Sequence, residues 1–64
     1  MIDIYDFLEL YTTCDDIEIY DFLTESTVFS GDPTDAKHEF GEYTVESFDI
    51  EANGKLIINT SIDD

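Results

Sequence analysis

The sequence predicts an α+β fold: an antiparallel four-stranded sheet of two hairpins, with an N-terminal helix packed on it and a short connecting helix. Three observations lead to this prediction. Apolar residues near the N-terminus recur at helical spacing, two later regions alternate around turn-forming clusters, and an Asp-Pro pair stands between these regions. With 64 residues, 42% of them hydrophobic, the chain can bury one core, so we expect a single domain over residues 1–64.

The first element is predicted to be a helix. Its apolar residues lie on one stripe at positions i, i+3, i+4 and i+7, namely Ile4, Phe7, Leu8 and Tyr11. Asp3 precedes this stripe as an N-cap, and Asp6 falls in the first turn, where the helix dipole favours a negative charge. The pattern ends at residues 12–13, and a first strand over residues 2–11 is the alternative that the sequence leaves open.

A seven-residue string occurs twice, as IDIYDFL at residues 2–8 and IEIYDFL at residues 17–23, with six identical letters. Turn-forming clusters flank the second copy, so we expect a hairpin of residues 17–23 with 27–30 that turns at 24–26. The string is thus predicted to form a helix first and a strand second. A tandem repeat is the alternative, but the similarity stops after the string, whereas solenoid repeats run to ~20 residues or more.

The connecting helix is predicted between the two hairpins. Asp32 has the character of an N-cap, Pro33 fits the first helical position, and Gly41 is suited to end the helix. Phe40, in the last turn, is expected to anchor this helix to the core.

The last hairpin is the most fully specified element. Residues 51–55, EANGK, suit a three-residue loop with Gly54 in the left-handed region. This loop sets three pairs: Glu51 with Lys55, Ile50 with Leu56, and Phe48 with Ile58. Upstream, the apolar residues change from odd to even positions, which predicts a bulge near residues 46–47. Residues 56–58 are apolar on both faces, so we expect them in an interior strand.

The charge sets this chain apart from an ordinary globular domain. Seventeen acidic residues stand against two lysines, Lys37 and Lys55, and the net charge is −15 at pH 7. Self-repulsion at this charge destabilises the folded state at low salt. Nucleic acids and anionic membranes attract proteins of the opposite sign, so we expect no direct binding to either.

We expect a soluble, cytoplasmic protein. Cys14 has no second cysteine to pair with, which favours a reducing compartment. The N-terminus lacks the basic residues and apolar run of a signal peptide, and no stretch reaches the ~20 apolar residues of a membrane span.

No constellation of residues predicts catalysis, a metal site or a cofactor. His38 and Cys14 are each the sole residue of their kind, whereas zinc sites need a cluster of such ligands. The two could act as base and nucleophile, but a helix-end histidine and a small, partly buried thiol are the simpler interpretation. Paired carboxylates act as acid and base only in a pocket that separates their pKa values. We therefore expect no enzymatic activity, no metal and no cofactor.

The predicted partner-binding residues are acidic. Glu18, Asp49 and Glu51 alternate with apolar neighbours on predicted strands and so face solvent. Residues i and i+2 of a strand stand ~6.6 Å apart, close to the phosphate spacing along a nucleic-acid strand. Asp6 and Glu9, one helical turn apart, are expected to form a second row beside them. Three further acids are candidates to extend this row: Glu39, Glu42 and Glu46.

The acidity could also have a cause unrelated to a partner. Any half-buried sheet turns its polar residues outward, so the spacing adds little, and the argument depends on the sign and size of the charge. Adaptation to high salt makes whole proteomes acidic, although eight isoleucines and many phenylalanines and tyrosines make such adaptation less attractive here. The sequence therefore leaves open both an ordinary solvated sheet face and adaptation to high salt as causes of the acidity.

In length, charge and lack of arginine, the whole chain resembles the small acidic proteins of phages and mobile elements that mimic DNA, the anti-CRISPR and anti-restriction inhibitors. The resemblance rests on size and composition and not on a motif, so it assigns a role to no individual residue. It implies a non-enzymatic decoy that occupies a basic nucleic-acid-binding protein.

A second hypothesis is a protein-interaction or homodimerisation module whose affinity comes from apolar surface. Tyr5, Tyr20 and Tyr43 are candidates for exposure, and tyrosine is well suited to interfaces. A sheet edge over residues 27–30 could pair with a copy of itself. The alternative for the tyrosines is ordinary core packing with the hydroxyl at the rim.

Overall fold

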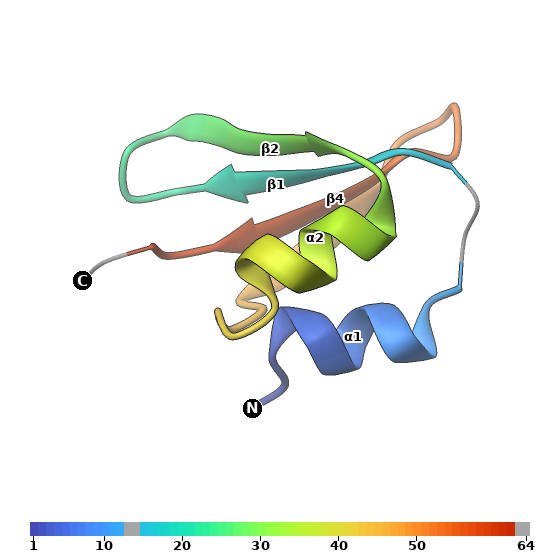
Figure 1. Cartoon of the computed structure of the whole chain (residues 1–64). Helices are drawn as coiled ribbons and strands as arrows, with labels where there is room; N and C mark the ends of the chain where they lie inside the picture. The colour runs from blue at the N-terminus through green and yellow to red at the C-terminus, as the bar shows by residue number, and fades with distance from the viewer. Residues whose placement is uncertain (13–14, 63–64) are drawn as a thin grey trace.

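The computed structural model describes residues 1–12 and 15–62 as a two-layer structure (Figure 1). A four-stranded sheet forms one layer, and two helices that cover one of its faces form the other. In chain order the elements are α1 (Ile4–Leu10), β1 (Ile17–Asp21), β2 (Ser26–Gly31), α2 (Pro33–Phe40), β3 (Ser47–Ile50) and β4 (Leu56–Thr60). The predicted α+β class and the predicted order of helices and strands are confirmed.

Both helices begin at their predicted N-caps. The carboxylate of Asp3 accepts the N–H of Asp6 at 2.8 Å, and that of Asp32 accepts a backbone N–H of its own first turn at 2.7 Å. Ile4 and Leu8, one turn apart, are both buried. The segment that follows Asp3 is therefore a helix, and the alternative of a first strand is wrong.

The two helices pack closely at Gly41, the residue that ends α2. A Cβ at this position would clash with the carbonyl oxygen of Lys37 and would lie 3.1 Å from the Cβ of Tyr5 on α1. The N–H of Tyr5 also donates to the carbonyl of Gly41 at 3.0 Å. Gly41 has a right-handed φ of −60°, so this position needs glycine for the close approach of the helices and not for a left-handed turn.

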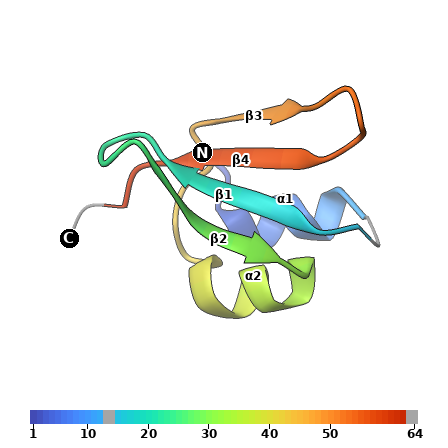
Figure 2. The same ribbon diagram turned by 90° about the horizontal axis from the view of Figure 1, so that it is seen from above.

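The sheet is mixed, which corrects the prediction of a purely antiparallel sheet. Its strand order is β2-β1-β4-β3, and the two antiparallel hairpins join through a parallel pairing of β1 with β4. Figure 2 shows the arrows of β1 and β4 pointing the same way. Because β2 and β3 then also run in one direction, at opposite edges, the chain between them must cross the sheet. In Figure 2, α2 runs back beside β2, and residues 41–46 then reach β3 at the other edge. Each turn specifies its own hairpin, but the pairing between hairpins joins residues far apart in the sequence.

The first hairpin differs from the prediction in its boundaries. β1 ends at Asp21 and not at residue 23, because the Asp21 carboxylate accepts the N–H of Leu23 and the hydroxyl of Thr24, both at 3.0 Å. The turn also includes Glu25, which has a left-handed φ of 55°. β2 then carries Val28 as an extra residue, where its register with β1 shifts in a bulge.

The last hairpin has the predicted register and turn. Its apolar pairs are Ile50 with Leu56 and Phe48 with Ile58. The N–H of Glu51 donates to the carbonyl of Lys55 at 2.9 Å, and Gly54 has a left-handed φ of 91°. β4 lies between β1 and β3, so the prediction of an interior strand at residues 56–58 is confirmed.

The change of apolar phase before β3 also occurs where it was predicted. The N–H of Glu46 donates to the carbonyl of Asn59 at 2.9 Å, and Asn59 pairs with Ser47. Glu46 and Ser47 thus face a single residue of β4, as in a β-bulge. Before this point the N–H of Val45 donates to the carbonyl of Ile2 at 2.9 Å, so the chain lies against the segment that precedes α1.

The core lies between the sheet and the helices. Its buried apolar side chains are Ile4, Leu8, Ile17, Ile19, Ala36, Leu56 and Ile58. Phe40 packs against this cluster, as predicted, with its ring centroid 5.7 Å from that of Phe29. Asp21 and Thr60 are also buried, and the Thr60 hydroxyl donates to the carbonyl of Thr44 at 2.6 Å. One sheet face therefore has a packed core beneath it, and the other remains at the surface.

Candidate partner-binding surface

The face of the sheet that the helices leave uncovered carries every second residue of the strands. In β1 and β4 the residues that face the helices are buried, and the residues between them are half-buried on the opposite side. We call this second side the open face. In the central strands and β3 it comprises Glu18, Tyr20, Ser47, Asp49, Ile57 and Asn59.

The acids predicted to form the centre of the contact share the open face. Glu18 of β1 and Asp49 of β3 pair with Ile57 from its two sides, so their Cα positions stand two strand spacings, ~10 Å, apart. Glu51 follows two residues after Asp49, opposite Lys55 in the hairpin. The structure therefore brings these three acids together on one side of the sheet.

Lys55 lies within this group of acids. Its Nζ is 3.1 Å from Oε2 of Glu18, and both side chains are 29% exposed. The ion pair offsets the charge of Glu18, so Asp49 and Glu51 carry the larger part of the negative charge here. The hairpin turn alone places Lys55 opposite Glu51, but its contact with Glu18 depends on the parallel pairing of β1 with β4. Sequence reasoning therefore missed this neutralisation.

Asp6 and Glu9 do not lie beside the sheet acids. Both belong to α1, which covers the opposite side of the sheet (Figure 1). The Glu9 carboxylate accepts a hydrogen bond from Lys37 Nζ of α2 at 2.7 Å, and this bond raises the pKa of Lys37 above its ordinary value. The two expected rows of acids therefore lie on opposite layers of the molecule and not side by side.

The remaining candidate acids are also divided between the layers. Glu39 and Glu42 line an open hollow of about 440 Å³ beside α2. Its other lining residues are Asp3, Tyr5, Lys37, His38 and Gly41. Glu46 stands before β3, with its carboxylate 3.4 Å from the hydroxyl of Ser61. Exposed acidic side chains thus occur on both layers of the described structure.

The hollow beside α2 contains His38, the base of the nucleophile-and-base alternative. Lys37 in this hollow is held by Glu9 and lies over the ring of Tyr5, with Nζ 5.5 Å from the ring centroid. Cys14 falls outside the described residues. Within residues 1–12 and 15–62, no three side chains of His, Cys, Asp or Glu are close enough together to hold a metal ion.

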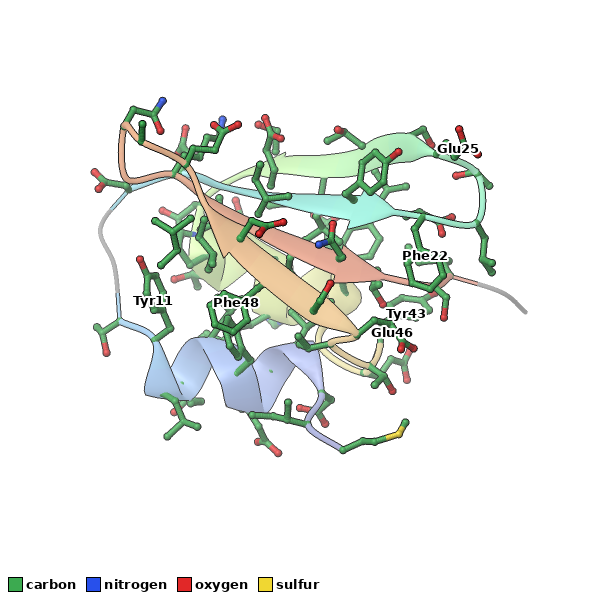
Figure 3. All side chains as sticks on the ribbon, turned by 180° about the vertical axis from the view of Figure 1, so that it is seen from behind. Tyr11, Phe22, Glu25, Tyr43, Glu46 and Phe48 are labelled. Carbon is green, nitrogen blue, oxygen red and sulfur yellow. The ribbon has the colours of Figure 1, made fainter. Side chains whose placement is uncertain are left out.

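The surface also has an apolar feature beside β3 that sequence reasoning missed. Phe48 and Ile50 face the helix layer but remain 48% and 52% exposed, because β3 is an edge strand that α1 covers only in part. The ring centroid of Phe48 lies 5.0 Å from that of Phe7, and Phe7 stacks on Tyr11 at 6.2 Å. Figure 3 shows Phe48 and Tyr11 between β3 and α1. We call Phe7, Tyr11, Phe48 and Ile50 the apolar border. The alternation along β3 predicts that Phe48 and Ile50 face the helix layer, but it does not predict that they remain exposed.

The three tyrosines considered for an interface differ in exposure. Tyr5 is 50% exposed, whereas Tyr20 is half-buried on the open face. Tyr43 is partly buried against the core, with its ring centroid 5.9 Å from that of Phe40. The tyrosines therefore form no common patch, and the apolar border is the more continuous apolar surface.

Comparisons with protein-family models, with characterised proteins and with solved structures find no match to this chain. In the described part of the chain, no helix combines the length and the apolar character needed to cross a membrane. The functional argument therefore depends on the charge and geometry of the surface.

Proposed function

We propose that this protein is a non-enzymatic acidic inhibitor that occupies a basic nucleic-acid-binding surface on another protein. One observation carries the proposal. Both lysines of the chain are engaged with its own carboxylates, Lys37 with Glu9 at 2.7 Å and Lys55 with Glu18 at 3.1 Å. The surface offered to a partner therefore has negative charge in excess on both layers, and neither lysine is left to attract an anion.

A surface of this kind favours a basic partner for two physical reasons. Complementary charge steers the encounter and raises the association rate, and it discriminates against partners of the same sign. A groove that binds phosphates also accepts carboxylates, since arginine can bind either anion through two parallel hydrogen bonds and lysine can bind either as a point charge. The inhibitor needs no catalytic group, because occupying the groove is enough to exclude nucleic acid.

The proposal is tested first by capture. The protein is immobilised and exposed to a lysate of the source organism near physiological salt, with separate elutions by duplex DNA and by high salt. A basic nucleic-acid-binding protein released by both is the expected result. The proposal is contradicted if no protein is retained, or if the retained protein is released by neither DNA nor high salt.

The open-face acids are tested next with the captured protein. The triple variant Glu18→Gln, Asp49→Asn and Glu51→Gln is expected to weaken binding by about tenfold or more while the fold is retained. A matched control removes three charges from exposed acids elsewhere: Glu25→Gln, Glu39→Gln and Glu42→Gln. If the control weakens binding as much as the triple variant, net charge and not the open face governs the interaction.

The apolar border favours a second candidate function, a protein-interaction module, of which homodimerisation is the form that can be tested without a partner. Phe48 and Ile50 are about half exposed on an edge strand, which is the position from which a sheet can extend to another chain. If two copies pair through apolar surface, added salt should strengthen the dimer, because it screens the repulsion between two chains of charge −15. Sedimentation at low and high salt measures this, and a chain that is monomeric at both contradicts the homodimer.

A further inference from the structure

The two edges of the sheet differ in how well they could accept another strand. β2 carries the bulge at Val28, contacts α2, and leads through Gly31 directly into that helix. Bulges and covering elements are among the features that blunt a sheet edge. β3 has its bulge at its start, at residues 46–47, and then keeps an unbroken register with β4 over residues 47–50. Of the two edges, the one formed by β3 is the better template for an added strand.

The backbone of β3 offers hydrogen-bonding groups to such a strand. In an antiparallel strand, successive residues direct their N–H and C=O groups to opposite edges. The N–H of Glu51 points inward, since it donates to the carbonyl of Lys55 at 2.9 Å. By this alternation the N–H and C=O groups of Phe48 and Ile50 point outward, away from β4.

The side chains beside this edge differ sharply between the two faces. On the helix side stand Phe48 and Ile50, with Phe7 and Tyr11 of the apolar border next to them. On the open face stands Asp49, followed by Glu51, and both are exposed. Directly opposed residues of neighbouring strands have Cβ atoms ~5 Å apart, so each face selects the residues of an added strand.

We propose that the free edge of β3 binds an extended segment of the partner in which apolar and basic residues alternate. The segment adds to the sheet as a fifth strand: its backbone pairs with Phe48 and Ile50, its apolar residues pack on the apolar border, and its lysines or arginines face Asp49 and Glu51. This inference rests on the proposed function for the sign of the partner's charge. It adds the contact surface and the sequence pattern of the partner.

A second copy of this chain fits the same edge poorly. An antiparallel pair of β3 strands centred on residue 49 would place the Asp49 of one copy directly opposite the Asp49 of the other. Like charges at such positions are destabilising, and each chain also carries a net charge of −15. The acids beside the edge therefore disfavour self-pairing and leave the edge open to a basic segment.

The test uses three short capped peptides and the full chain. In the first peptide lysine and valine alternate, the second has the same composition in two blocks, and the third is the alternating peptide N-methylated at every second residue. We expect the alternating peptide to bind about tenfold more tightly than either control. Its binding is expected to slow amide hydrogen exchange at Phe48 and Ile50, measured by NMR. Equal affinity for all three, without protection at β3, overturns the inference.

Charge reversal at the edge sharpens the test. Asp49→Lys is expected to weaken binding of the alternating peptide by about tenfold. Glu25→Lys makes the same change of charge at the exposed turn between β1 and β2 and is expected to change affinity much less. Equal loss in both variants shows attraction by net charge alone and overturns the inference.

The remaining outcomes separate this inference from the proposed function. If the chain captures a nucleic-acid-binding protein but does not distinguish the peptides, the proposed function stands and the β3 edge is not its contact. If the chain distinguishes the peptides but retains no such protein, the inference stands and the proposed function is wrong. If amide exchange at Phe48 and Ile50 slows as the protein concentration rises, without any peptide, the edge binds a second copy of the chain and the inference is overturned.

Discussion

Two copies of nearly the same seven-residue string form different structures in this protein. IDIYDFL at residues 2–8 forms most of α1, whereas IEIYDFL at residues 17–23 forms β1 and the turn after it. The strings differ only at their second position, which is Asp3 in one copy and Glu18 in the other. Asp3 is the N-cap of α1, and aspartate is a preferred N-cap whereas glutamate is not. The single difference therefore falls where it affects the start of a helix.

The equivalent side chains also have different environments in the two copies. Ile4 and Ile19 are buried in both, but Leu8 is buried in the helix whereas its counterpart Leu23 is 54% exposed. A helix returns to the core after four residues, and a strand does so after two, so the same apolar letters cannot all be buried in both structures. The comparison shows that an apolar residue contributes to the core only through the period of the element that carries it.

The largest expected difference between the copies is at their last residue. Leu8→Ala should cost about 2–5 kcal/mol, because it opens a cavity in the core, and a chain of this size has only roughly 3–5 kcal/mol of stability. Leu23→Ala should change the free energy of unfolding by about 0.5 kcal/mol or less, since the side chain is exposed. Urea denaturation followed by circular dichroism measures both. Similar losses in the two variants contradict the different burial of these leucines.

The next difference concerns the aspartate of each copy, Asp6 and Asp21. Burial opposes ionisation of Asp21, but hydrogen bonds from the N–H groups of Leu23 and Ile62 and from the Thr24 hydroxyl outweigh it and lower its pKa. Asp21→Asn should therefore lower the urea midpoint at neutral pH more than Asp6→Asn, because Asp6 is exposed in the first turn of α1. An equal effect of the two substitutions argues against a structural role for the buried carboxylate.

The Asp21 effect has a defined pH dependence. A carboxyl group whose pKa is lower in the folded state stabilises that state above its unfolded pKa, and this contribution is lost as the pH falls through the folded pKa. The difference in stability between the wild type and Asp21→Asn should thus be complete at neutral pH and shrink below about pH 4. Urea midpoints at several pH values test this, and a difference that persists unchanged at pH 2 contradicts it.

A smaller effect is expected at the N-cap. Asp3→Glu gives the first copy the residue of the second and replaces a carboxylate that accepts the N–H of Asp6 at 2.8 Å. The expected cost is about 1 kcal/mol, because the longer side chain caps poorly. Denaturation and the helical signal of residues 4–10 measure it. If stability is unchanged, the cap does not contribute to the difference between the copies.

The smallest effect is expected from Glu18→Asp, which makes the two strings identical. The shorter carboxylate reaches Lys55 less well, and the loss of this partly exposed ion pair should cost about 1 kcal/mol or less. Residues 17–21 should remain a strand, because β2 and β4 pair with β1 on both sides. Cross-strand NMR contacts between β1 and β4 provide the measurement. A helix over the second copy would show that the string and not its neighbours decides the structure.

Much of the fold could be predicted because several of its signals are local. Asp3 and the Asp32-Pro33 pair start the helices, and Gly54 closes a hairpin whose register follows from its loop. The end of β1 could not be placed in this way. Asp21 accepts hydrogen bonds from Leu23 and from Ile62, which follows β4, so part of the turn depends on a strand far away in the sequence.

The candidate site could also be predicted only as far as local signals reach. The alternation along β1 and β3 correctly turns Glu18 and Asp49 to one side of the sheet. It does not reveal that Lys55 meets Glu18, nor that Asp6 lies on the other layer. Both depend on how the hairpins and helices are assembled.

The sequence by itself determined the helix starts, the last hairpin and the excess negative charge of this protein, since each depends on residues within a few positions of one another or on composition. The tertiary structure alone decided the parallel pairing of β1 with β4, and with it which acids lie together, which are neutralised and which strands form the edges of the sheet. The physical reason is that contacts between distant segments are selected by the burial of the whole core. No short stretch of sequence contains that information.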